Sequence, residues 1–312
     1  MRARTLILGL CVLLLATVPP LAALAGQPYY VELLRRVMIF AIAATSLNLI
    51  LGYGGLVSFG HAAYLGVGGY AVGIFAFYGV HSGWLQWTVA IGASALVALA
   101  IGAISVRTRG IYFIMITLAF TQMLYYLGIS VEEYGGDDGL RLKVKSQFWG
   151  LVDLNDPVAF YYVVLALLLA VIYLVHRLVN SRFGLVLRAA KSNEARTRAI
   201  GFSPYPYQLA AFVIAGAICG LAGALLANQT AYIAPAFMDW TRSGEIMFMV
   251  ILGGMGTTPG PALGAFALLI VEDLLAGWTE HWQVFLGPLL VLSVLFFKRG
   301  LAGLLPGGRK DG

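Results

Sequence analysis

The chain has 312 residues, of which 60% are hydrophobic and only 11% are charged, and its mean hydropathy is +0.87. A soluble domain carries roughly a quarter charged residues, so the composition excludes an ordinary soluble protein and predicts a polytopic membrane protein. The apolar runs are uninterrupted and lack the alternation of a membrane β-barrel, so we expect an all-α fold. The net charge of +6 is what the positive-inside rule produces in such a protein and does not indicate a nucleic-acid partner.

About ten apolar segments are suited to form transmembrane helices. They are residues 6–24, 36–51, 59–79, 84–105, 110–131, 158–179, 207–228, 244–257, 261–277 and 282–298. The eighth is short for a full crossing of the bilayer. The first follows Arg2 and Arg4 and ends near Ala-Leu-Ala at 23–25, so it resembles a signal peptide. It is nevertheless long enough to cross, and we expect it to be retained as the first span.

Lysine and arginine residues in the short connections orient the chain with both termini in the cytoplasm. The cytoplasmic side then holds Arg107, Arg109, the basic segment 181–206 and a basic C-terminal tail. The periplasmic side holds most of the acids and the loop 132–157, but it also receives basic residues: Arg35, Arg36, Arg141, Lys143 and Lys145. We expect one transmembrane domain, 1–312. Five spans on each side of the loop would give two inverted halves, as in inverted-repeat transporters.

The sequence contains no motif for catalysis. A phosphate-binding loop of the form Gly-x-x-x-x-Gly-Lys-Ser/Thr, a His-Glu-x-x-His pair and a Gly-x-Ser-x-Gly turn are all absent from the 312 residues. We therefore expect no enzyme activity and no cofactor, and any ATP must be bound by another subunit. The two cysteines, Cys11 and Cys219, lie in apolar segments and the four histidines are scattered, so no metal site is predicted.

Polar groups at membrane depth are few, which weakens, without excluding, the alternative of a stand-alone secondary transporter or channel. The polar candidates for a translocation path are Asn48, Ser58 and His61, although a lone histidine beside a glycine-rich turn is more commonly a packing residue. Glycine-rich breaks at 51–61 and 252–261 would either line a path or allow close helix packing. The second break adds further path candidates, Gly253, Gly254, Gly256 and Pro259.

One long polar segment, Ser181–Gln208, interrupts the apolar runs and contains a single acid, Glu194. Its basic residues are Arg182, Arg188, Lys191, Arg196 and Arg198. The pattern predicts one short helix through Gly184–Ala199, capped by Ser181 and ended by Gly201. Such a helix either lies along anionic lipid headgroups or docks a soluble partner.

Glu194 and Ala195, followed seven residues after the acid by Gly201, resemble the Glu-Ala-Ala…Gly coupling motif of permeases in ATP-binding cassette (ABC) importers; Arg196 replaces the second alanine. Four further stretches extend the resemblance. They are NLILGYGGLVSFGHAAYLGVGGY at 48–70, RGIYFIMITLAF at 109–120, the Gly-Gly-x-Asp-Gly-Leu pattern at 135–140 and ILGGMGTTPGPALGA at 251–265. Together with LRAAKSNEARTRAIG at 187–201, they make most of the chain similar to the branched-chain amino acid permeases, the LivH/LivM family, and closest to its LivM type.

The resemblance implies a permease subunit in a bacterial inner membrane that moves branched-chain amino acids inward, using ATP hydrolysed on a separate subunit. Urea or a short amide is the alternative substrate within the same class. The implied partners are a second permease subunit, cytoplasmic ATP-binding subunits, a periplasmic substrate-binding protein and membrane lipid. The periplasmic loop 132–157 is either a solvated connector or a docking surface for that binding protein. The residues expected to couple to the ATPase are Arg188, Lys191, Glu194, Ala195, Arg196 and Gly201.

Overall fold

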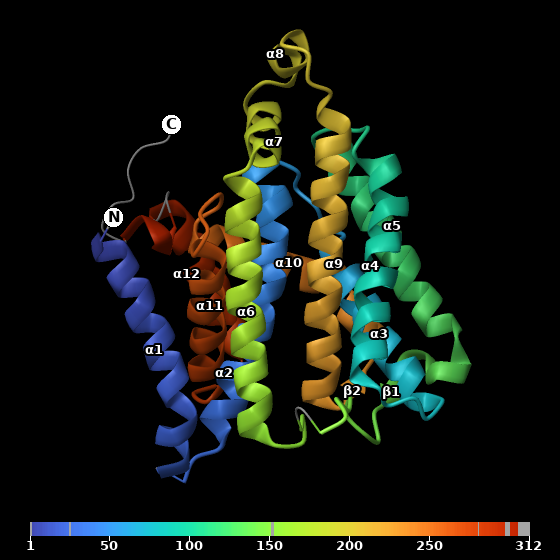
Figure 1. Ribbon diagram of the computed structural model, residues 1–312, viewed down its shortest axis with the longest axis vertical. Helices are drawn as coiled ribbons and strands as arrows, with labels where there is room; N and C mark the ends of the chain where they lie inside the picture. Colours follow the sequence, from blue (N-terminus) through green and yellow to red (C-terminus); the bar gives the residue numbers. More distant parts are fainter. Residues whose placement is uncertain (1, 25, 151–152, 280, 297–299, 305–312) are drawn as a thin grey trace.

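The computed structural model describes residues 2–24, 26–150, 153–279, 281–296 and 300–304 (Figure 1). Over these residues the protein is an all-α bundle, which confirms the expected fold class. The α-helices are α1 (Arg2–Leu24), α2 (Tyr29–Asn48), α3 (His61–Phe77), α4 (Gly83–Ser105), α5 (Ile111–Ser130), α6 (Pro157–Val179), α7 (Arg182–Ser192), α8 (Glu194–Ala199), α9 (Pro204–Thr230), α10 (Trp240–Gly253), α11 (Gly260–Ala276) and α12 (Trp282–Phe296). The remaining elements are a π-helix, η1 (Leu49–Tyr53), the 3-10 turns η2 (Glu132–Tyr134), η3 (Gly136–Asp138), η4 (Pro235–Met238) and η5 (Leu301–Leu304), and two strands, β1 (Leu140–Arg141) and β2 (Tyr232–Ile233).

A helix lies at each of the ten expected segments, although residues 297 and 298 of the last one lie outside the described residues, as does the C-terminal tail from 305. Five helical stretches are long and apolar enough to cross a membrane: α2 with η1, α4, α5, α6 and α9. α10 has 14 residues and α11 has 17, which at 1.5 Å per residue is less than the roughly 30 Å hydrocarbon core. Ten crossings therefore stay a prediction.

The core forms around α2 and α9. α2 is buried without interruption from Val37 to Asn48, and it packs against α6, α9, α10 and α11. α9 lies along α3 and α4. A β-carbon at Gly68 of α3 would collide with the carbonyl oxygen of Gly220 in α9. These helices therefore approach through small residues, as interhelical packing in membranes favours.

α7 and α8 project from one end of the bundle, and the two short strands lie at the other (Figure 1). We call these the α8 end and the β1 end. β1 and β2 pair antiparallel, with Leu140 opposite Ile233 and Arg141 opposite Tyr232. The amide of Ser146 donates a hydrogen bond of 2.8 Å to Oδ1 of Asn228 in α9. The described part of the loop 132–157 is thus attached to α9 and to the connection that follows it.

The segment 54–60, between η1 and α3, is non-helical and leads to His61, whose side chain is fully buried. Buried backbone groups need partners where water is absent, and neighbouring side chains supply them. Thr117 Oγ1 accepts from the Phe59 amide at 3.3 Å, and Ser243 Oγ accepts from the Ala62 amide at 2.9 Å. The first glycine-rich break therefore forms an internal, side-chain-stabilised start for α3.

The largest boundary difference from the sequence-based expectation is at the start of α2, and α10 lies four residues earlier than expected, at Trp240–Gly253. α2 begins at Tyr29 and not near residue 36, so Arg35 and Arg36 belong to the helix and not to a connecting loop. Both guanidinium groups contact aromatic rings: that of Arg35 lies 4.7 Å from the ring centroid of Phe160, and that of Arg36 lies 5.9 Å from that of Phe40. These cation–π contacts stabilise arginine inside an apolar helix, which hydropathy does not detect.

Candidate coupling site

The basic segment forms two helices and not the single helix expected. α7 ends at Ser192, and Asn193 is extended, with φ −158° and ψ 105°. The Asn193 side-chain oxygen accepts a hydrogen bond of 2.9 Å from the Arg196 amide, so it caps α8 in the way asparagine caps helix N-termini. Ser181 precedes α7 in an extended conformation, but its hydroxyl donates to the Leu178 carbonyl at 2.6 Å and does not cap the helix.

Gly201 ends α8 as expected. Its φ is +92°, a left-handed conformation that is costly for residues with a β-carbon. The Gly201 amide donates to the Arg198 carbonyl at 2.9 Å, and the Phe202 amide donates to the Thr197 carbonyl at 3.2 Å. This pair of bonds is the Schellman arrangement that satisfies the last carbonyls of a helix. It turns the chain sharply toward α9.

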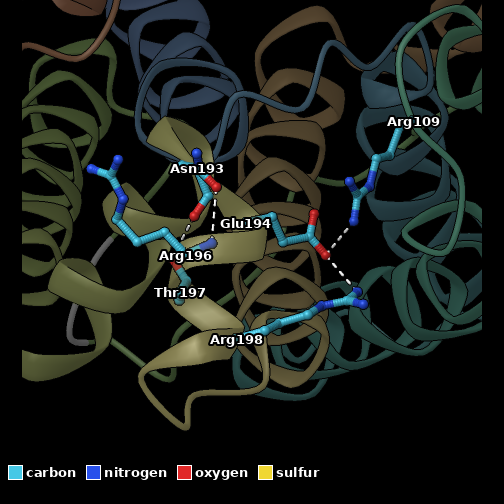
Figure 2. Close-up of polar contacts among 6 residues, drawn as sticks. All are labelled: Arg109, Asn193, Glu194, Arg196, Thr197 and Arg198. Atoms are coloured by element: carbon cyan, nitrogen blue, oxygen red, sulfur yellow. Dashed lines mark hydrogen bonds and ion pairs between the residues drawn. The ribbon is translucent and has the colours of Figure 1, made fainter.

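Glu194, the single acid, is paired within the chain (Figure 2). Its Oε1 lies 2.5 Å from a guanidinium nitrogen of Arg109 and 2.6 Å from one of Arg198, and its side chain is only 14% exposed. Of the five basic residues of the segment, Arg198 alone is bonded to it; the second partner, Arg109, belongs to the connection between α4 and α5. The acid therefore ties α8 to the start of α5, a link that the local sequence does not reveal.

Lys191 connects α7 to the core. Its Nζ donates a hydrogen bond of 2.6 Å to the carbonyl oxygen of Gly52 in η1. A side chain at Gly52 would collide with the side chain of Asn48 and with the backbone of Gly256. The glycine therefore lets three segments meet at one point.

Asn48 joins the two glycine-rich breaks at this point. Its Oδ1 accepts from the Gly256 amide at 2.9 Å, and its Nδ2 donates to the Thr257 carbonyl at 2.9 Å. The turn between α10 and α11 is thereby fixed to the end of α2. Lys191 and this turn are therefore bonded to the same helical stretch, α2 with η1, at Gly52 and at Asn48.

A cleft of about 460 Å³ opens beside these contacts. Its walls come from the 54–57 segment, from the start of α5, from the junction of α7 and α8, and from α9. The polar lining residues are Arg109, Lys191, Ser192, Asn193, Glu194 and Gln208. Arg109, Gln208 and Gly55 were not among the residues selected from the sequence, because their role depends on segments that meet only in the fold.

The predicted path residues lie elsewhere. Asn48, Ser58 and His61 are fully buried and do not line this cleft. His61 Nε2 lies 2.7 Å from Ser46 Oγ, while Ser58 Oγ accepts from the Gly60 amide at 3.1 Å. Gly253 ends α10, and Gly254, Gly256 and Pro259 form the turn that precedes α11. Their role in translocation remains a prediction.

Two large apolar side chains are exposed at the turn that ends α8, residues 200–202, which we call the tip. Ile200 and Phe202 flank Gly201 and are 66% and 45% exposed. Ala195, Arg196 and Arg198 on α8 are also exposed, as is Arg188 on α7. The tip thus combines an apolar centre with a basic rim, the composition of a protein contact surface. Within the part of the chain that the structure describes, no group of three His, Cys, Asp or Glu residues could hold a metal ion.

The bundle defines a polytopic helical membrane protein, with a helix pair that projects from one end. Residues 29–294 match the family described as branched-chain amino acid transport system / permease component. The chain belongs to this family, and it is an inner-membrane transport protein of the LivM/LivH type.

Curated relatives agree with this assignment. The chain is 28% identical over 295 residues to the high-affinity branched-chain amino acid transport system permease protein LivM of Salmonella typhimurium, covering 87% of this chain and 69% of the relative. It is 23% identical over 285 residues to LivH of Escherichia coli K12, covering 85% and 91%. The autoinducer 2 import system permease protein LsrC of Yersinia pseudotuberculosis is 28% identical over 226 residues, covering 66% and 62%. No solved structure matches significantly.

Proposed function

We propose that the chain is the permease subunit of an ABC importer and moves branched-chain amino acids inward, driven by ATP hydrolysis on a separate subunit. In this proposal the α8 end faces the cytoplasm and the β1 end faces the periplasm. The observation that carries it is the α7–α8 pair, which projects from the bundle and is bonded to the core through Lys191 and Glu194.

The tip of the pair docks into a groove of the ATP-binding subunit. Ile200 and Phe202 provide the apolar contact, because they are exposed and the Schellman turn at Gly201 holds them in place. The basic rim orients the partner and speeds association more than it adds affinity. Glu194 acts inside the permease, since its carboxylate is already bonded to Arg109 and Arg198.

Movement of the ATP-binding subunit then reaches the bundle by two routes. Lys191 transmits it to η1 and the turn before α11, and Glu194 transmits it to the start of α5. Both routes border the cleft of about 460 Å³. A rigid-body shift of the helix pair would change the width of this cleft, as packed elements move between discrete positions. The cleft is the proposed cytoplasmic exit.

The partners follow from the same proposal. A second, LivH-like permease completes the membrane part, ATP-binding subunits dock at the α8 end, and a periplasmic substrate-binding protein delivers the amino acid at the β1 end. Substrate choice rests largely with the binding protein. Since a permease of an autoinducer 2 importer is also a relative, the substrate panel must reach beyond leucine, isoleucine and valine to urea and short amides.

Co-purification with the ATP-binding subunits and ATP-driven uptake in proteoliposomes test the proposal. Ile200→Ser with Phe202→Ser should abolish co-purification and uptake. The matched control is Leu185→Ser, which changes another exposed apolar residue on α7 away from the tip. Undiminished ATPase binding and uptake by the double variant would contradict the docking assignment, and uptake without any ATP-binding subunit would contradict the ABC class.

A further inference from the structure

Five charged residues lie on α2, α10 and α11 toward the β1 end of the bundle. They are Arg36 on α2, Arg242 and Glu245 on α10, and Glu272 and Asp273 on α11. Other long helices of the bundle, α4, α5 and α9, carry no Asp, Glu, Lys or Arg, and the coupling site does not use these five residues.

The five residues form one mixed-charge cluster. Arg36 and Glu272 pair across α2 and α11, with 3.7 Å between Nη2 and Oε1. Arg242 and Glu245 pair on α10 at 2.8 Å. Glu272 also interacts electrostatically with Arg242, Glu245 and Asp273. The two ion pairs are therefore close enough to influence one another. The Tyr29 hydroxyl donates to Asp273.

The cluster is unsuited to face lipid. Charges on membrane helices are costly and normally face a partner or a watery cavity. α10, with 14 residues, is only about 21 Å long, so it cannot place both of its ends outside the roughly 30 Å core. The Arg36 and Glu272 side chains are nevertheless 43% and 24% exposed. Both charged side chains are therefore accessible to a polar ligand.

A small cavity lies within the cluster. Its volume is about 90 Å³, and it is lined by Arg36, Glu272, Asp273, Leu33, Leu269 and Ala276. One wall therefore carries a cation, another carries two acids, and the rest is aliphatic. At roughly 30 Å³ per water in the liquid, the cavity has the size of a small charged head group and not of a whole large ligand.

We propose that this cavity binds the ammonium and carboxylate groups of a zwitterionic aliphatic amino acid on its way into the permease, a role that rests on the proposed import function. Arg36 pairs with the substrate carboxylate, which guanidinium groups bind strongly. Glu272 and Asp273 pair with the ammonium group. Leu33, Leu269 and Ala276 form the aliphatic wall beside the α- and β-carbons of the substrate, because the cavity is too small to enclose its whole side chain.

The long Arg36–Glu272 pair suits such a role. At 3.7 Å and with both partners partly exposed, it contributes little stability of its own. A zwitterion placed between the two side chains replaces one weak ion pair by two. Urea has no separated charges and gains nothing from this exchange, so the cavity selects amino acids over uncharged amides.

Binding of radiolabelled L-leucine to the purified complex of permeases and ATP-binding subunits, without the binding protein, tests the site. The wild-type complex should bind L-leucine, and neither L-leucinamide nor 4-methylpentanoate should compete well, because each lacks one charge. Arg36→Gln and Glu272→Gln should each weaken binding at least about tenfold, the loss that corresponds to roughly 1.4 kcal/mol. Arg177→Gln, an exposed arginine at the α8 end of α6, is the matched control.

A charge exchange separates binding from packing. Arg36→Glu combined with Glu272→Arg keeps an ion pair but reverses the field, so L-leucine binding should stay weak although the complex assembles. Recovery of binding in this double variant would overturn the proposal by assigning the pair a purely structural role. Failure of the wild-type complex to bind L-leucine, or loss of the second permease from the charge variants, would also overturn it.

The import function is judged separately. ATP-driven L-leucine uptake by the wild-type complex with its binding protein supports that function whatever happens at the cluster. If wild-type uptake is normal and Arg36→Gln leaves it unchanged, the cluster assignment alone is wrong. If the wild-type complex takes up no amino acid, the proposed function itself is wrong.

Discussion

Lys191 on α7 donates a hydrogen bond of 2.6 Å to the carbonyl oxygen of Gly52 in η1, the π-helix that continues α2. The bond joins a helix at the surface to the most buried helix of the bundle. Asn48, four positions before Gly52, is bonded to the amide of Gly256. Displacement of α7 therefore acts on α2 and on the turn before α11 together.

Lys191→Met tests this link. Methionine keeps an aliphatic stem against Gly55, which the lysine stem borders closely, but it cannot donate to Gly52. Losing a partly exposed hydrogen bond of about 1 kcal/mol should reduce uptake about fivefold while the ATP-binding subunit still co-purifies. Arg182→Met, at the other end of α7, serves as the control. Loss of co-purification in Lys191→Met would instead place the lysine in the docking surface.

Gly201 offers a purely conformational test. A β-carbon there would meet no atom within 4 Å, so substitutions act only through the φ of +92°. Gly201→Asn should retain most ATPase binding, because asparagine tolerates the left-handed region. Gly201→Val should weaken binding strongly, since a β-branched residue is an outlier there. Pull-down of the ATP-binding subunit ranks the two variants, and equal retention by both would show that the turn is not needed.

The sequence predicted the helical segments and their interruptions because hydropathy and glycine content are local properties. It could not predict the contacts of Glu194, because Arg109 lies 85 positions earlier and pairs with it only in the fold. The break at Asn193 was missed for a different reason. The Gly184–Ala199 segment has continuous helix-forming character, and a single asparagine cap divides it.

The charged cluster was also hidden from the sequence. Arg36, Glu245 and Glu272 are separated by long apolar runs, and each lies near an expected helix end, where charges are common. Only the packing of α2 against α11 places Arg36 and Glu272 around one cavity, and only the packing of α10 against both helices brings Glu245 near them. Hydropathy predicts where the helices lie in the sequence. It does not predict which faces of distant helices pack against one another.

The orientation has a direct test. Ser192 is the last residue of α7, at the α8 end, and Asp137 lies three residues before β1, at the other end; both are exposed. In a background with Cys11→Ala, and with Cys219 buried, Ser192→Cys should react with a membrane-impermeant maleimide only from the cytoplasmic side. Asp137→Cys should react only from the periplasmic side. Labelling with the opposite sidedness would reverse the topology and remove the coupling role of the α8 end.

The docking of α1 provides a final prediction. Pro19 and Pro20 lie inside α1 and lack amide hydrogens, so the carbonyls four residues earlier, those of Leu15 and Ala16, lose their helical partners. The hydroxyls of Tyr161 and Tyr162 in α6 donate to these same two carbonyls, at 2.8 and 3.0 Å. The two tyrosine hydroxyls therefore supply the hydrogen bonds that the two prolines cannot donate to these carbonyls.

Tyr161→Phe combined with Tyr162→Phe should lower the free energy of unfolding by about 2 kcal/mol, roughly 1 kcal/mol for each hydrogen bond. Denaturation in mixed micelles measures it, and Tyr173→Phe, an exposed tyrosine of the same helix, should change little. Replacing Pro19 and Pro20 by alanine restores the helical partners of both carbonyls. In that background the tyrosine substitutions should cost much less stability. The restored amides of residues 19 and 20 then compete with the two tyrosine hydroxyls for the same carbonyls. Strictly additive losses would mean that the hydroxyls do not compensate for the prolines.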